Sequence, residues 1–122
     1  MDKKKILIVD DERDVLSVLG KRLTEEGYFV ITAETGNDAI TLAKSKCPDL
    51  IVLDIDLPDM HGGEVALKLK ENPKTKSIPV IFLSCLYSKT DEVEKGHLIG
   101  NNVIFSKPYE MRELLTAIKE LL

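Results

Sequence analysis

Charged and hydroxyl side chains directly follow short apolar runs at several places in this chain. The apolar run 6–9 is followed by Asp10 and Asp11, and the run 50–53 is followed by Asp54. The other side chains placed in this way are Asp56, Ser84 and Lys107. If each run is a strand of one parallel sheet, its carboxyl end delivers these groups to a common edge, where such sheets bind ligands.

The chemistry open to such a cluster is phosphoryl transfer. Three crowded carboxylates repel one another, and a hard divalent cation such as Mg²⁺ compensates their charge while accepting a phosphate oxygen. A carboxylate such as Asp54 can act as a nucleophile and form an acyl phosphate. Lys107 could then pair with one phosphoryl oxygen, and the Ser84 hydroxyl could donate a hydrogen bond to another.

The elements that must position these groups alternate along the chain. Compact apolar runs predict strands over 5–9, 28–33, 50–53, 79–83 and 102–105. Apolar residues at helical spacing predict helices over 12–26, from a cap at Thr35 to Cys47, and over 64–71, 88–99 and 110–122. Five successive βα units predict an α/β fold, a doubly wound, five-stranded parallel sheet covered by helices on both faces.

The helix over 88–99 has the least support, because Gly96 interrupts it and its apolar face is thin. His61 and His97 have no metal-ligand spacing and are expected in solvent. Cys47 and Cys85 are expected to be small buried hydrophobic residues.

Composition limits the class of protein. The 122 residues form one predicted domain, 1–122, without room for an effector domain. A net charge of −4 argues against direct nucleic-acid binding. No apolar run is long enough for a membrane span or a signal peptide, and two cysteines without a disulfide framework suit a cytoplasmic protein.

Five of these features in order resemble the receiver domain of two-component response regulators, over the whole chain. They are the acidic pair that ends Ile6-Leu7-Ile8-Val9-Asp10-Asp11, then Val52-Leu53-Asp54, then Leu57-Pro58 with Gly62, then Ser84, and Lys107-Pro108 after the last strand. The resemblance implies a flavodoxin-like (βα)5 fold with strand order 2-1-3-4-5.

The resemblance also implies a role for each site residue. Asp54 would be the phosphoacceptor, and Mg²⁺ would be held by Asp11 directly, by Asp10 through water, by Asp54 and by the backbone carbonyl of Asp56. Ser84 and Lys107 would contact the phosphoryl group. The Lys107-Pro108 bond would be cis, as is frequent in the family.

The sequence departs from the family's pattern at several positions. Ile104 stands where the family usually has an aromatic switch residue, and Cys85 follows Ser84 where Ala or Gly is commoner. Leu86 is apolar where polar residues often occur, and Asp56 adds a carboxylate near the site.

The implied function is a phosphorylation-dependent switch, whose phosphoryl group comes from a histidine kinase, a phosphotransfer protein or a small phosphodonor. Self-dephosphorylation would be the only other reaction, so the chain would not be an enzyme on external substrates. A downstream effector protein or domain would bind the face of the fourth helix, fifth strand and fifth helix (88–99, Ile104 and 109–115), and a phosphorylation-dependent dimer is left open.

Three other interpretations of the chain or of its acidic residues remain. A pseudo-receiver would bind partners without being phosphorylated. A phosphatase of the haloacid-dehalogenase-like kind also uses an Asp-x-Asp motif, but places it on the first strand, whereas Asp54-Ile55-Asp56 follows the third. Asp10 and Asp11 could also merely cap a helix.

Overall fold

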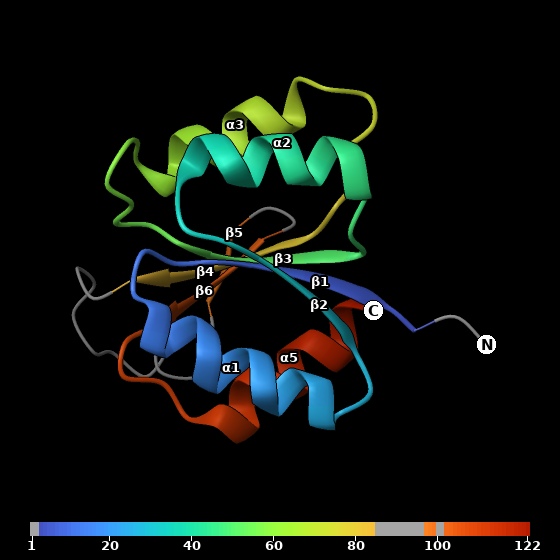
Figure 1. The fold of residues 1–122 in the computed structure, drawn as a ribbon, viewed down its shortest axis with the longest axis vertical. Helices are drawn as coiled ribbons and strands as arrows, with labels where there is room; N and C mark the ends of the chain where they lie inside the picture. Colours follow the sequence, from blue (N-terminus) through green and yellow to red (C-terminus); the bar gives the residue numbers. More distant parts are fainter. Residues whose placement is uncertain (1–2, 85–96, 100–101) are drawn as a thin grey trace.

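A computed structural model describes residues 3–84, 97–99 and 102–122, and it has the alternating order that the sequence predicts (Figure 1). The strands are β1 (Lys5–Val9), β2 (Phe29–Ala33), β3 (Leu50–Asp54), β4 (Val80–Ser84), β5 (His97–Ile99) and β6 (Asn102–Ser106). The helices are α1 (Arg13–Glu25), α2 (Gly36–Lys46), α3 (Gly62–Lys70) and α5 (Met111–Leu121). Each predicted strand and four of the five predicted helices are therefore present, within a few residues of their expected bounds.

All six strands form one sheet, in the order β2-β1-β3-β4-β6-β5. Strands β2, β1, β3, β4 and β6 are parallel neighbours. They confirm the predicted order 2-1-3-4-5, with β6 as the predicted fifth strand. Adjacent strands end nearly level, since Val9 pairs with Leu53 and Asp54 pairs with Leu83. Side chains that follow these strands are thereby brought to one edge.

The predicted helix over 88–99 is wrong at its carboxyl end. Residues 97–99 are strand β5, which pairs antiparallel with β6 through His97↔Ile104 and Ile99↔Asn102, and 88–96 lie outside the described residues. Without β5, the outer edge of β6 would present unpaired backbone N–H and C=O groups, which a short adjacent strand satisfies. Pairing with the edge of β6 therefore outweighs the weak helical pattern at 97–99.

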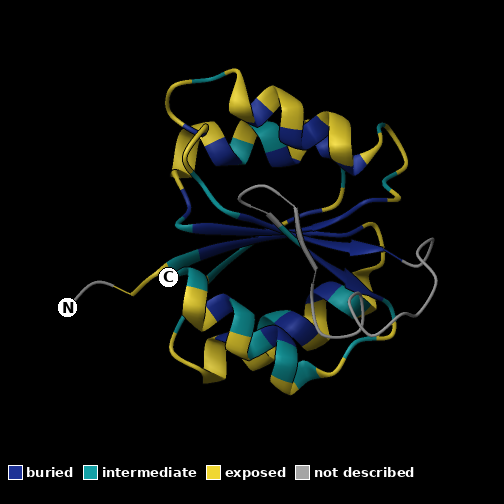
Figure 2. Cartoon of the chain, turned by 180° about the vertical axis from the view of Figure 1, so that it is seen from behind, coloured by how far each residue is buried: buried dark blue, intermediate teal, exposed yellow. Residues whose placement is uncertain are grey.

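Two helical layers enclose the sheet, with α2 and α3 on one face and α1 and α5 on the other (Figure 1). The central strands β1, β3 and β4 are buried between them, while the edge strand β2 is partly exposed and the outer faces of the helices are exposed (Figure 2). Alternate strand residues belong to two separate cores: Leu7, Ile51 and Leu53 pack under α2 and α3, whereas Ile8 and Val52 pack under α1 and α5. This two-sided burial is why the central strands are continuous apolar runs.

Single residues mark the carboxyl end of α1 and both ends of α2. Gly27, just beyond α1, has a φ of +96°, a conformation that glycine adopts without steric cost. The Thr35 hydroxyl accepts a hydrogen bond from the amide of Asp38 (3.1 Å), which confirms the predicted cap of α2. Cys47 ends α2 in the left-handed conformation and is exposed, so its predicted burial is wrong. Cys85 lies outside the described residues.

Among the described residues, none of the helices has both the length and the apolar character that crossing a membrane would require.

Candidate functional site

Three carboxylates meet at the carboxyl edge of the sheet. Asp10 and Asp11 follow β1 and Asp54 ends β3, and one carboxylate oxygen from each lies within 4.8 Å of those of the other two. Asp10 and Asp54 are buried, with exposed fractions of 1% and 4%, whereas Asp11 is exposed. The cluster therefore has a buried floor and a side open to solvent.

Lys107 supplies the positive charge that faces these carboxylates. It follows β6, and its Nζ lies 3.1 Å from Asp10 Oδ2 and 3.5 Å from Asp54 Oδ2. Its backbone amide donates to the carbonyl oxygen of Ser84 (2.9 Å), and the Lys107-Pro108 peptide bond is cis, as expected. The ammonium thus bridges Asp10, which follows β1, and Asp54, which ends β3.

Burial and charge shift two pKa values in the site. Burial raises the pKa of Asp54, and the Asp10 and Asp56 carboxylates add to that effect, against the amide of Asp56 and the Lys107 ammonium, which lower it. Burial alone would lower the pKa of Lys107, but its hydrogen bond to Asp10 and the charges of Asp10 and Asp54 together raise it. Lys107 therefore stays protonated at neutral pH, and the ionised form of Asp54 is disfavoured without further positive charge.

Asp54→Asn should accordingly stabilise the metal-free protein at neutral pH. The folded pKa of Asp54 is raised, so its ionisation weakens folding above that pKa, and the penalty disappears as pH falls below it toward 3.8. Asparagine carries no such penalty and keeps an acceptor for the Asp56 amide. Thermal melting in a chelator should give a higher Tm for Asp54→Asn at neutral pH and nearly equal values in acid. A lower Tm at neutral pH would mean that attraction to Lys107 outweighs burial.

The remaining predicted residues lie around this cluster. The Asp56 amide donates to Asp54 Oδ1 (3.2 Å), which fixes the orientation of that carboxylate, and the Asp56 residue is exposed. Ser84 is fully buried at the end of β4, one residue beyond Leu83, the partner of Asp54. Ile104, at the position where the family usually has an aromatic residue, is buried against Phe82 and its neighbours. Leu86 lies outside the described residues.

Two contributors near the site were missed by reasoning from sequence. His61, expected in solvent without a role, is exposed but caps α3, since its Nδ1 accepts from the amide of Gly63 (2.9 Å). Asp59 accepts from the amides of Gly36 (2.7 Å) and Asn37 (2.9 Å) at the start of α2. A polar residue before Gly62-Gly63 could have suggested the cap, but no local signal points from Asp59 to α2.

The donor set fits a hard divalent cation. It consists of carboxylate oxygens from three residues, without the sulfur or imidazole ligands that softer metals prefer. One carboxylate, that of Asp11, is open to solvent, which suits an ion that retains several waters. The cluster can therefore bind a metal ion, and the cation would offset the mutual repulsion of these acids.

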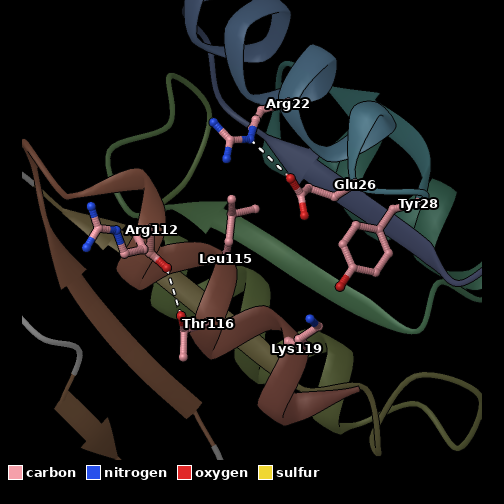
Figure 3. A pocket seen from close by; sticks show the side chains of 7 residues that line it. All are labelled: Arg22, Glu26, Tyr28, Arg112, Leu115, Thr116 and Lys119. Carbon is pink, nitrogen blue, oxygen red and sulfur yellow. Dashed lines mark hydrogen bonds and ion pairs between the residues drawn. The ribbon is translucent and has the colours of Figure 1, made fainter.

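A pocket of about 210 Å³ lies apart from the acidic cluster, between α1 and α5 (Figure 3). Its lining includes Arg22, Arg112 and Lys119, and its single carboxylate, Glu26, is paired with Arg22 at 3.3 Å. This lining is basic, the reverse of what a metal cation requires. The acidic edge of the sheet is thus the better candidate for the metal.

A family model described as the response regulator receiver domain matches residues 6–119. The chain belongs to the response regulator receiver family. Its relatives include the alkaline phosphatase synthesis transcriptional regulatory protein PhoP of Bacillus subtilis (strain 168), 37% identical over 98% of this chain and 48% of that protein. The probable transcriptional regulator ycf27 of Guillardia theta is 35% identical over 98% of this chain and 46% of its own length. The receiver spans about half the length of these curated relatives.

Solved structures agree with this assignment. The chemotaxis response regulator CheY4 of Vibrio cholerae superposes with a TM-score of 0.83 at 27% identity, covering 99% of this receiver and all of that chain. A response regulator described as putative, from Chloroflexus aurantiacus J-10-fl, gives the same TM-score at 28% identity and 98% coverage of both chains. The flavodoxin-like fold expected from the sequence is therefore confirmed.

Proposed function

We propose that this receiver is a phosphorylation-dependent signalling switch that accepts a phosphoryl group on Asp54 with Mg²⁺ as cofactor. One observation carries the proposal: the buried Asp54 carboxylate lies within 4.8 Å of the Asp10 and Asp11 carboxylates and 3.5 Å from the Lys107 ammonium. A nucleophile, a cation-binding pair and a fixed positive charge are the groups that phosphoryl transfer requires.

Asp54 is the proposed nucleophile. One of its carboxylate oxygens forms a bond to the phosphorus atom while the bond from phosphorus to the donor's leaving group breaks, and the leaving group departs with that electron pair. The Asp56 amide holds Oδ1, which leaves Oδ2, on the Lys107 side, as the oxygen that attacks. Lys107 then offers its ammonium to the phosphoryl oxygens, and Ser84, at the same edge, offers its hydroxyl.

The metal would be held by the carboxylates of Asp11 and Asp54, by Asp10 through water and by the backbone carbonyl of Asp56. Bound Mg²⁺ supplies positive charge that neutralises the oxygens of the phosphoryl group. The protein's own part is to bury the floor of the site and to hold Asp54, at the end of β3, and Lys107, after β6, at the same edge of one sheet.

The proposed phosphodonors are a histidine kinase, a phosphotransfer protein or a small acyl phosphate, and the proposed compartment is the cytoplasm. Apart from self-dephosphorylation no turnover is proposed, and no external substrate. The output surface would include residues 109–115 at the start of α5, for an effector protein or domain or a second receiver. Ile104 on β6, predicted to belong to this surface, is buried in the core beside Phe82 and does not contribute to it directly. The predicted contribution of 88–96 to that surface lies outside the described residues.

Intact-protein mass spectrometry after incubation with acetyl phosphate and Mg²⁺ tests the proposal. We expect one phosphoryl adduct on the parent protein, none on Asp54→Ala and none when a chelator removes Mg²⁺. Asp38→Ala, which removes an exposed carboxylate from the first turn of α2, is the matched control and should be modified like the parent.

The absence of an adduct from the parent, under conditions that modify another receiver, would favour the pseudo-receiver instead. Ile104 is the residue that favours the pseudo-receiver, because a buried aliphatic side chain offers no aromatic ring to rotate in response to phosphorylation. An adduct that persists in Asp54→Ala would place the phosphoacceptor elsewhere.

A further inference from the structure

The segment from Ile55 to His61, called here the β3–α3 loop, is closed at its base by backbone contacts. The Gly62 amide donates to the carbonyl of Ile55 (2.8 Å), and Asp56 and His61 form an antiparallel bridge. The Ile55 amide donates in turn to the carbonyl of Leu83 on β4 (3.0 Å). The base is therefore anchored to the sheet, while the tip near Asp59 needs a separate anchor.

That anchor is the amino end of α2. The two carboxylate oxygens of Asp59 accept from the amides of Gly36 (2.7 Å) and Asn37 (2.9 Å), and the Thr35 hydroxyl accepts from the next amide, Asp38. Asp59 thus satisfies two amides that the first turn of a helix leaves without a partner. These two hydrogen bonds lower the pKa of Asp59, so its charge is retained throughout the neutral range.

Tight packing beside these bonds limits movement of the tip. A Cβ atom at Gly36 would lie 2.5 Å from Met60 Cγ and 2.9 Å from Val65 Cγ2. The backbone of α2 therefore lies directly against Met60, and no larger residue fits without displacing it. The loop tip is fixed by the hydrogen bonds that Asp59 accepts from α2 and by the close packing of Met60 against Gly36.

We infer that Asp59 is a positioning residue for the site, acting through the β3–α3 loop without touching the metal or the phosphoryl group. The loop carries Asp56, whose amide orients Asp54 Oδ1 (3.2 Å) and whose carbonyl is a proposed metal ligand. If the tip is released, both backbone groups of Asp56 lose a support. The part of this inference that concerns Mg²⁺ rests on the proposed function, whereas the part that concerns the loop does not.

The experiment compares Asp59→Ala with Thr35→Ala and with the near-isosteric Asp59→Asn. Thr35→Ala also removes a cap from α2, but it leaves the β3–α3 loop untouched, so both alanine variants should lower Tm by similar amounts. In metal-free protein, amide hydrogen exchange at Asp56 and Gly62 should become several-fold faster in Asp59→Ala and remain at the parent rate in Thr35→Ala. Asp59→Asn, which retains one oxygen acceptor, should be intermediate.

Mg²⁺ binding, measured by calorimetry on the unphosphorylated protein, provides the second readout. The dissociation constant should rise about tenfold in Asp59→Ala, the scale of losses when groups that support ligands are removed, and should be unchanged in Thr35→Ala. Equal exchange rates and equal Mg²⁺ affinities in the two alanine variants would overturn the inference and reduce Asp59 to a helix cap. If the parent itself accepts no phosphoryl group, the proposed function fails, but the exchange comparison still decides the role of Asp59 in the loop.

Discussion

A Lys107→Ala variant is expected to be phosphorylated by acetyl phosphate about 100-fold more slowly than the parent, while its affinity for Mg²⁺ does not fall. In the parent, the ammonium lies 3.1 Å from Asp10 and 3.5 Å from Asp54, in position to meet charge that develops on the phosphoryl oxygens. Loss of one such fixed group from a buried site lowers rates by roughly 100-fold or more. The carboxylates that would hold the proposed Mg²⁺ remain, and without the lysine the site carries more net negative charge.

The variant separates the role of the Lys107 ammonium from that of the proposed Mg²⁺. For Lys107→Ala, the phosphorylation rate at saturating Mg²⁺ should fall. The Mg²⁺ affinity, measured by titration of the unphosphorylated protein, should not fall. Lys68→Ala on α3 removes an exposed cation away from the site and should change neither measurement. Metal-free Lys107→Ala should also be less stable by roughly 3 kcal/mol at neutral pH, because it leaves two buried carboxylates without a cation. A parent-like phosphorylation rate would remove Lys107 from the proposed mechanism.

The second large effect concerns Gly62→Ala. A Cβ atom at this position would lie 2.7 Å from Ile55 Cα and 2.9 Å from the carbonyl oxygen of Asp54. Both neighbours are backbone atoms, so relief requires the chain at Asp54 and Ile55, the proposed phosphoacceptor and the residue after it, to shift. We expect a loss of about 3 kcal/mol in the free energy of unfolding and a fall of roughly 10 °C in Tm, together with slower phosphorylation.

Gly20→Ala on α1 is the matched control for that substitution. Its added Cβ would lie 3.6 Å from Val30 Cγ1, an ordinary packing distance. Since alanine favours the helical conformation, this variant should be more stable than the parent by about 0.5–1 kcal/mol. Chemical denaturation of both variants measures the contrast, and a tolerated Gly62→Ala would show that the loop after β3 has more freedom than its contacts indicate.

Much of the fold and of the site was accessible from sequence, because both depend on chain-wide patterns. Strands buried on both faces must be apolar throughout, so β1, β3 and β4 are visible as uninterrupted runs. Once these runs are placed in one parallel sheet, topology alone brings Asp10, Asp54 and Lys107 to the same edge. The cluster was predicted without knowing a single side-chain conformation.

The features that were missed depend on pairings between particular groups. The strand at 97–99 pairs with the side of β6 that β4 does not occupy, a condition set by the rest of the sheet and invisible within three residues. Asp59 reaches an amide 23 positions earlier in the chain, and no periodicity encodes that contact. Cys47 is exposed because α2 ends on it in a left-handed turn, although its residue type favours burial.

The ion pair between Asp10 and Lys107 also bears on the order in which the molecule can be assembled. These two residues are 97 positions apart, so their contact closes almost the whole chain into a loop, at an entropic cost that only the completed sheet can offset. A folding intermediate with β1, β2 and β3 in place would already hold all three carboxylates, yet it would lack the cation that compensates them. The proposed phosphoryl acceptance would therefore require the docking of β6, because such an intermediate would carry the acids of the site without Lys107.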